Sequence, residues 1–332
     1  MPCFHPLKGY YSNVLNETGK RSLVFTPDKA LLPVPVSVPC GRCIGCRLDR
    51  SLDWAVRCVH ESKMHTNNCF ITLTFDDKHL DEHRSLKVKD FQDFMKKFRR
   101  YVEPTRIRFF HCGEYGSKFG RPHHHACIFG YDFPDKKLLK KFGDVSIYSS
   151  DILSNLWGYG FCTVGDVTFK SAAYVARYVL KKWCSDDISA DQLYQYMKAH
   201  SNSRRRILKK SDVNDSFKKD FYNGLKPEYI TMSRKPGIGA TFFEKFKSDM
   251  FPSGSVILPS GNLIPTPKYY DNLFSLDNSF QLAMMKCERI ARSLSSPDNS
   301  KARLEAREEV KKANLNNSKR SFENGAECYI NP

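Results

Sequence analysis

The segment RPHHHACIF places three histidines in succession at residues 121–129. If it forms a β-strand, the period of two sends His123 and His125 to one face and His124 to the other. Glu114 lies just before the connecting loop, so its carboxylate can reach the same point from the partner strand. We therefore expect His123, His125 and Glu114 to form a three-ligand metal site with open positions for water or substrate. The alternative is that the histidines only occupy a solvent-facing strand, and His124 is not counted as a ligand.

A second chemical signal is AAYVARYVLKK, in which two tyrosines stand four residues apart. On a helix Tyr174 and Tyr178 share one face, and each is followed three residues later by a cation, Arg177 or Lys181. Adjacent cations and a metal-bound phosphate favour the phenolate and stabilise the charge of a phosphorane. Attack on a DNA phosphate would then give a phosphotyrosine. The competing interpretation is an amphipathic helix whose tyrosines pack half-buried.

A third group is an unusually tight C-x2-C-x2-C at Cys40, Cys43 and Cys46. Thiolates at this spacing can wrap a tetrahedral zinc ion, which would stabilise a segment too poor in apolar residues to fold alone. We expect a structural zinc with Cys3 as the fourth ligand, and His5 is the other upstream candidate. An iron–sulfur cluster and unligated thiols are the alternatives.

Hydrophobic periodicity predicts the elements that carry these residues. Apolar residues recur at helical spacing in some segments, and short β-branched and aromatic runs indicate strands in others. Their order implies an α+β fold with helices packed on an antiparallel sheet. The predicted helices are Leu48–Val59, Val88–Val102 and Ser171–Lys182, and the predicted strands are Cys69–Phe75, Ile107–His111, His125–Phe129 and Phe161–Phe169.

The chain divides by texture into three segments. Residues 1–50, rich in Pro, Gly and Cys, are expected to form an irregular zinc-binding module, and residues 51–190 are expected to form the domain that carries the histidine and tyrosine motifs. Residues 191–332 form a basic and helical extension that begins with the cationic run at 204–210, and its end has the composition of a disordered tail.

Composition narrows the partners. The chain has 332 residues, 41% hydrophobic content and a net charge of +17, which favours a polyanion such as nucleic acid. No stretch is apolar enough to span a bilayer or to serve as a signal peptide, so we expect a cytoplasmic protein. Cations at Lys96–Arg100, at residues 204–210 and at Arg234 and Lys235, beside a flexible PGIG turn, predict DNA binding that weakens steeply with salt.

In order and spacing, FITLTF, PHHH and YVARYVLK resemble the three motifs of rolling-circle replication initiators, the HUH endonucleases with paired tyrosines. The chain is most similar to the replication proteins of gokushovirus-type microviruses, which are phages with single-stranded DNA. CGRCIGCR, WGYGFCTVGDV and MSRKPGIG extend the resemblance over about residues 3–246. The sequence departs from the pattern at His124, because the middle position of the motif is usually bulky and apolar.

The resemblance implies an HUH endonuclease fold with a five-stranded antiparallel sheet, histidines on a central strand and the tyrosine helix laid across it. It also implies that Mg2+ or Mn2+ polarises the scissile phosphate while one tyrosine attacks the origin strand. That tyrosine keeps the 5′ phosphate and releases a 3′ hydroxyl that primes rolling-circle replication. The second tyrosine then cuts the regenerated origin, and the displaced strand is rejoined.

Such an initiator works on single-stranded and origin DNA in the host cell cytoplasm, together with a host helicase and polymerase. Two other functions fit the same residues. A relaxase or transposase would use this chemistry to mobilise DNA. A zinc-stabilised DNA-binding regulator would have no catalysis, and its histidines would be incidental.

Overall fold

The computed structural model divides into two compact units, each described here by itself. Ser51–Leu282 form the sheet unit, and Met1–Arg50 together with Ala283–Pro332 form the terminal unit. The division at residues 50 and 190 that the sequence suggests stays a prediction. The described residues are 3–17, 19, 21–80, 85–116, 121–143, 145–178, 226–251, 253–258, 260–295 and 297–326.

An antiparallel sheet forms the centre of the sheet unit, with strand order β10-β5-β6-β4-β9-β8-β7. The strands β4 and β6 lie in its interior, and every residue of β6 is buried. The bounds are β4 (Asn68–Thr74), β5 (Arg108–Tyr115), β6 (Pro122–Phe129), β7 (Lys137–Phe142), β8 (Val145–Ser149), β9 (Cys162–Gly165) and β10 (Tyr229–Met232).

Among the described residues this sheet has seven strands, whereas the resemblance implies five. The hairpin β7–β8 extends one edge and joins β9 through the pair Tyr148 and Val164. Periodicity did not reveal this hairpin, because Leu138 and Leu139 are both more than half exposed and β7 carries lysines between them and the turn. The antiparallel α+β class itself is as expected.

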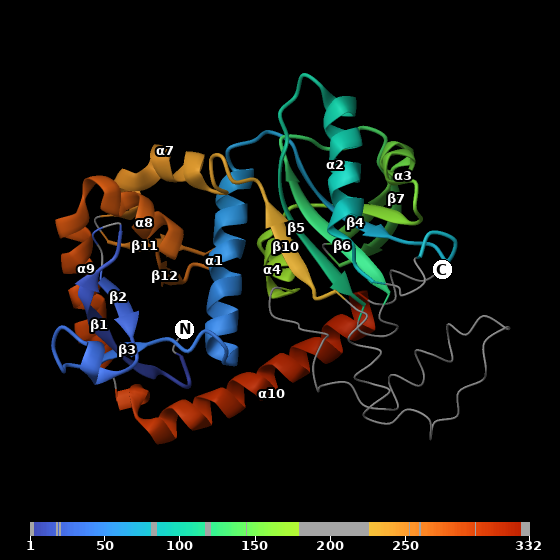
Figure 1. Ribbon diagram of the computed structural model, residues 1–332. Helices are drawn as coiled ribbons and strands as arrows, with labels where there is room; N and C mark the ends of the chain where they lie inside the picture. Colours follow the sequence, from blue (N-terminus) through green and yellow to red (C-terminus); the bar gives the residue numbers. More distant parts are fainter. Residues whose placement is uncertain are drawn as a thin grey trace. The chain divides into compact units, whose positions relative to one another are not determined.

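Two hydrophobic cores lie on opposite faces of the sheet. In Figure 1, α2 and α3 cover one face and α4 lies on the other. The first core includes Phe94, Phe98 and Trp157, and the second includes Ala55 of α1 and Val175 of α4. The described helices are α1 (Ile44–Ser62), α2 (Val88–Val102), α3 (Asp151–Trp157), α4 (Phe169–Tyr178), α7 (Ala240–Met250), α8 (Lys268–Asp277), α9 (Ser279–Leu294) and α10 (Lys301–Ala326).

The clearest sequence patterns gave the closest boundaries. The helix predicted at Val88–Val102 is confirmed as α2, with its apolar stripe buried and Lys96 and Lys97 exposed on the other side. The strand predicted from Cys69 is β4, and the tyrosine helix begins at Phe169. Its predicted continuation beyond residue 178 lies outside the described residues. No described helix is both long and apolar enough to cross a bilayer.

The terminal unit is more regular than the sequence suggests. Its first segment contains a three-stranded antiparallel sheet of order β2-β1-β3, so the expectation of an irregular module was wrong. Most side chains of β1 and β2 are exposed, which explains why alternation failed as a signal. The helix α10 continues to Ala326, well into the tail that we expected to be disordered. The bounds are β1 (Leu7–Leu15), β2 (Arg21–Val24) and β3 (Val36–Val38), and the sheet unit has a further hairpin of β11 (Ser255–Ile257) and β12 (Leu263–Pro265).

Trp157 at the end of α3 is fully buried, and its indole N–H donates to the Thr74 carbonyl at 3.0 Å. We predict that Trp157→Ala lowers the free energy of unfolding by about 3–5 kcal/mol, because it leaves a cavity and removes the hydrogen bond to the Thr74 carbonyl. Urea unfolding followed by circular dichroism measures the change. Leu138→Ala, at a side chain that is 61% exposed, is the control and should change it by less than about 0.5 kcal/mol. Equal midpoints for both variants would contradict this description of the core.

Candidate active site and metal centre

The strand β6 sends its three histidines to two different environments. His123 and His125 face the side of the sheet covered by α4, where the ring of His125 contacts Tyr174. His124 faces the opposite core, where its ring lies 5.6 Å from that of Trp157. All three side chains are at most 5% exposed. The solvent-facing strand considered as an alternative is therefore wrong for these histidines.

Neighbouring strands hold the histidine pair, with His125 contacted from both β4 and β5 and His123 contacted from β4. Thr72 of β4 pairs with His125 and Thr74 pairs with His123. The threonine hydroxyls lie 3.0 Å from Nδ1 of His125 and 3.3 Å from Nδ1 of His123. On the other side, Glu114 of β5 stands opposite His123 in the register, and its Oε1 lies 2.7 Å from Nε2 of His125. Sequence reasoning missed both threonines, although alternation in FITLTF could have placed them on this face.

The side chains of His123, His125 and Glu114 offer two imidazole nitrogens and a carboxylate, a donor set that suits a divalent ion such as Mn2+. In the structure the imidazole N–H of His125 donates to Glu114, and the two histidine rings have centroids 6.2 Å apart. This set is not among the groups whose ligand atoms already converge on a metal position in the described residues. Because Nε2 and Oε1 face each other, the hydrogen bond between them must open before both can ligate one ion.

The hairpin between β5 and β6 is tied down close to His123. The Gly116 amide donates to the Arg121 carbonyl at 2.9 Å. The Arg121 guanidinium donates at 2.6 Å to the Phe75 carbonyl and, also at 2.6 Å, to Asp77 Oδ1. A Cβ added at Gly116 would lie 2.9 Å from Nε2 of His123, so only glycine leaves room for the ring. Arg121 and Gly116 therefore fix the backbone next to His123, and the sequence motifs did not identify these contacts.

Tyr174 projects from α4 toward the histidines. Its ring meets the His125 ring edge-on, with centroids 5.2 Å apart and an interplanar angle of 89°. It also packs edge-on against Phe70 of β4 at 6.3 Å. The helix approaches the sheet closely because its buried side includes the small residues Ala172 and Ala176. The structure therefore brings one of the two predicted nucleophiles against the histidine pair.

The other members of the tyrosine motif have no described side chains. Tyr178 is the last residue of α4, one turn after Tyr174. The side chains of Arg177 and Tyr178, and all of Lys181, lie outside the described residues, as does the cationic run at 204–210. Their proposed roles stay predictions.

The segment after β10, Ser233–Gly239, is tightly held, which corrects the expectation of a flexible PGIG turn. Buried Glu61 accepts the Gly239 amide at 2.6 Å and pairs with Arg108, which in turn donates to the Pro236 carbonyl at 2.8 Å. Burial alone would raise the pKa of Glu61, but these donors and His65 lower it, so the carboxylate stays charged. The exposed Arg234 and Lys235 thus stand on a fixed loop.

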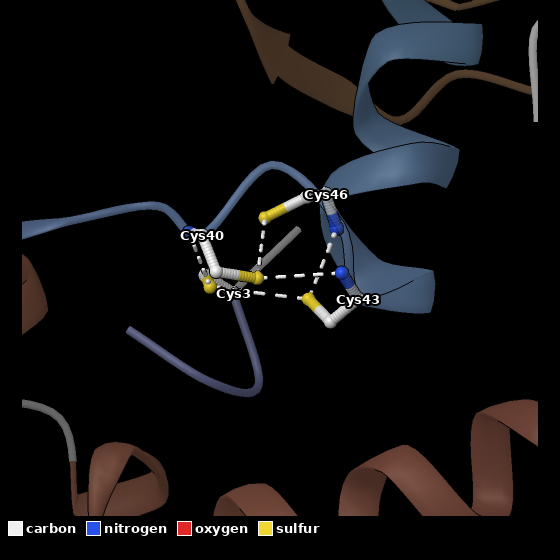
Figure 2. Close-up of side chains that lie close together, drawn as sticks. All are labelled: Cys3, Cys40, Cys43 and Cys46. Atoms are coloured by element: carbon white, nitrogen blue, oxygen red, sulfur yellow. Dashed lines mark hydrogen bonds between the residues drawn. The ribbon is translucent and has the colours of Figure 1, made fainter. Parts of the chain in front are cut away.

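Four thiols converge in the terminal unit, as Figure 2 shows. The sulfurs of Cys3, Cys40, Cys43 and Cys46 all lie within 4.8 Å of one another. The Cys3–Cys43 and Cys40–Cys46 sulfur distances are 3.8 and 4.0 Å. Four sulfurs placed 2.3 Å from one tetrahedral centre would be about 3.8 Å apart, so the group could hold a metal ion such as zinc.

Backbone amides point at these sulfurs, and such donors favour the thiolate form. The amides of Cys40, Cys43 and Phe4 donate to the sulfurs of Cys3, Cys40 and Cys43 at 3.2, 3.3 and 3.4 Å. Burial opposes ionisation of Cys43, but donors from Cys46 and Phe4 outweigh it and lower the pKa of this thiol to about 6. His5 instead pairs with Glu308 of α10 at 2.8 Å, so the cluster contains Cys3 as its fourth member.

Comparison with known proteins identifies the class of this chain. Residues 68–183, which hold both the histidine strand and Tyr174, match the family model described as replication-associated protein ORF2/G2P. The chain is 32% identical over 284 residues to replication-associated protein VP4 of Bdellovibrio phage phiMH2K, covering 82% of this chain and 77% of the relative. No solved structure matches it significantly.

Two further relatives extend the comparison. Replication-associated protein ORF2 of Spiroplasma virus 4 is 32% identical over 247 residues, covering 71% of this chain and 67% of the relative. Replication-associated protein ORF4 of Chlamydia phage 1 is 27% identical over 238 residues, covering 59% of each. The chain therefore belongs to the replication-associated proteins of gokushovirus-type phages.

The close approach at Gly116 gives a test of the histidine geometry. We predict that Gly116→Ala displaces the His123 ring and weakens Mn2+ binding by about tenfold, as changes behind a metal ligand commonly do. Titration with Mn2+, followed by electron paramagnetic resonance of the free ion, measures the affinity. Gly165→Ala is the control, because its Cβ would make only ordinary contacts at 3.8 and 3.9 Å. Equal affinities in the two variants would contradict the placement of His123.

Proposed function

We propose that this protein is a replication initiator that nicks one strand of a circular DNA origin and stays joined to it through a tyrosine. The single observation that supports the proposal most is the edge contact between Tyr174 and His125, whose ring centroids are 5.2 Å apart. It links the helix with paired tyrosines to the strand with paired histidines. Membership of a replication-associated family supports the biological role.

In the proposed reaction, the phenolic oxygen of Tyr174 or Tyr178 attacks a phosphate of the origin strand. A bond forms between phosphorus and the tyrosine oxygen, and the bond from phosphorus to the 3′ oxygen breaks. The phenol loses its proton and the leaving oxygen gains one, which leaves a 5′-phosphotyrosine and a free 3′ hydroxyl. One phosphate ester replaces another, so rejoining by a 3′ hydroxyl needs no nucleotide cofactor.

Mg2+ or Mn2+ bound by His123, His125 and Glu114 would supply Lewis-acid polarisation of the scissile phosphate. The task of the chain is to keep the two imidazoles and the carboxylate beside the phenol. Burial of all three side chains lowers the local dielectric, which would strengthen the attraction of the Glu114 carboxylate for a divalent ion. Arg177 and Lys181 are assigned to the developing phosphorane charge, because each follows a tyrosine by three residues.

The partners of this activity are single-stranded and origin DNA. The net charge of +17 supports binding to a polyanion, and exposed Lys96 and Lys97 of α2 and Arg234 and Lys235 offer phosphate contacts. After the nick, the DNA duplex must be unwound and the 3′ hydroxyl must be extended. We therefore include a host helicase and polymerase, in the host cell cytoplasm, as proposed partners.

We predict that Tyr174→Phe, Tyr178→Phe removes the covalent adduct with origin-bearing single-stranded DNA in the presence of Mn2+, because no phenol remains to attack. Each single variant keeps partial nicking, since either tyrosine can serve. The adduct is measured as a shifted band on a denaturing gel, and peptide mass spectrometry identifies the modified tyrosine.

Tyr148→Phe is the matched control for this experiment, because it removes a phenol from β8 of the same sheet. It should leave the adduct intact. An adduct that survives in the double variant would refute the role of α4. Absence of nicking by the parent protein on cognate DNA would favour the non-catalytic regulator, and transfer of ends between molecules would favour the transposase.

We further propose that the four cysteines bind a structural zinc ion. The tetrahedral sulfur spacing and the amide donors support this assignment. Among the described residues, the hydrophobic cluster around the thiols has only Phe4, Cys43 and Leu304 as buried members, so metal ligation would supply much of its stability.

For this site we predict one zinc per purified chain and its loss in Cys43→Ser, both measured by elemental mass spectrometry. Cys287→Ser, at an exposed thiol of α9, should keep the metal. Retention of zinc in Cys43→Ser would contradict the assignment. If the parent protein contains iron and sulfide, the four cysteines hold an iron–sulfur cluster and not zinc.

A further inference from the structure

The histidine pair is held from the side opposite to Glu114. Among the described residues, Thr72 and Thr74 are the β4 side chains that hydrogen-bond the two imidazoles, at 3.0 and 3.3 Å. Both threonines are less than 10% exposed, so solvent does not substitute easily for either hydroxyl. The register of β4 against β6 places each threonine directly across from its histidine.

The contacts orient both rings in the same sense. Nδ1 of each ring faces β4, while Nε2 of His125 faces Glu114 of β5. Nε2 of His123 also lies toward β5, because it would meet a Cβ on Gly116 at 2.9 Å. Both imidazoles therefore span from β4 to β5 and present the same nitrogen to the side that carries the carboxylate.

We propose that Thr72 and Thr74 are positioning residues that fix Nε2 as the ligand atom of both histidines. This inference rests on the proposed metal-assisted function and deepens it. A ring nitrogen that ligates a metal must have no proton, so the proton of the neutral ring sits on Nδ1 and needs an acceptor. A threonine hydroxyl can serve as that acceptor.

The hydrogen bond between His125 and Glu114 explains why a hydroxyl group is suited to contact Nδ1 of His125. With the metal absent, the Nε2 proton is donated to Glu114, so a neutral ring needs a donor at Nδ1. A hydroxyl can donate as well as accept, whereas a carbonyl can only accept and an ammonium can only donate. Thr72 can therefore support His125 both when it bonds Glu114 and when it ligates an ion.

The test replaces each threonine in the full-length chain. Thr72→Val and Thr74→Val keep the β-branched shape and remove the hydroxyl. We expect each to weaken Mn2+ binding by about 10–100-fold, the range found when partners of metal-bound histidines are removed. Thr72→Ser and Thr74→Ser should restore most of the affinity. Thr163→Val on β9 is the matched control, because Thr163 is the register partner of Thr72 and forms no hydrogen bond to either histidine among the described residues.

Two readouts separate positioning from a general loss of structure. The affinity for Mn2+ alone is measured by electron paramagnetic resonance, and 15N NMR of the histidine rings reports which nitrogen carries the proton. A valine variant should change the proton distribution of its own histidine and leave the thermal midpoint close to that of Thr163→Val. Saturating Mn2+ should restore DNA nicking.

Unchanged Mn2+ affinity and ring signals in both valine variants would overturn the inference. Failure of the proposed function would give a different result. In that case the Tyr174→Phe, Tyr178→Phe variant would still form the adduct, while the effect of the threonine variants on Mn2+ affinity would be unchanged. If His123→Ala and the parent protein bind Mn2+ equally, the assignment of the metal site is wrong, and the role proposed for the threonines is then wrong as well.

Discussion

The register of three adjacent strands is the constraint on which the site depends. Because β4, β6 and β5 pair antiparallel, Thr74, His123 and Glu114 stand in one row across the sheet. A slip of one residue in β6 would send both outer histidines to the opposite core and bring His124 to the helix α4. Both faces of β6 are buried, so such a slip would leave polar rings without their partners and apolar residues without their core. The geometry of the site is thus specified by the same packing that specifies the fold.

Periodicity in the sequence was sufficient wherever a segment had one clear role. The helix α2 has a single apolar stripe against a charged face, and its bounds were predicted correctly. The strands β5 and β6 were longer than predicted, because their polar ends at Glu114 and His123 are buried as part of the site and do not look like core residues. The threonines and Arg121 were missed for a related reason. Their contacts cross between strands, and spacing along one segment does not reveal which partner lies opposite.

The terminal unit shows the limit of composition as a guide. Its tight cysteine spacing identified three members of the thiol cluster and Cys3 was expected as the fourth, which agrees with the cluster that the fold brings together. His5 lies near in sequence to Cys3, yet its imidazole is engaged by Glu308. Amide donors to sulfur lower the pKa of the Cys43 thiol, and they come from backbone whose path the residue types do not predict. The turn before Cys43 is possible because Gly41 takes a positive φ of 72°.

The opposite face of β6 shows how three identical side chains come to lie in different environments. Nδ1 of His124 lies 3.1 Å from Nε2 of His111. Nδ1 of His111 in turn lies 2.9 Å from the Thr231 hydroxyl. Burial lowers the pKa of His124 to about 3 and also lowers that of His111, so both rings are neutral. One ring donates an N–H to the other in the hydrogen bond between them. Phe91 stacks on His111, and no carboxylate among the described residues hydrogen-bonds either ring. A cation here would face aromatic rings without a counter-charge, whereas Glu114 supplies one on the other side. The position of a single carboxylate, Glu114, therefore distinguishes His123 and His125, which are proposed as ligands, from His124, which lies between them in the sequence but on the other face of the strand.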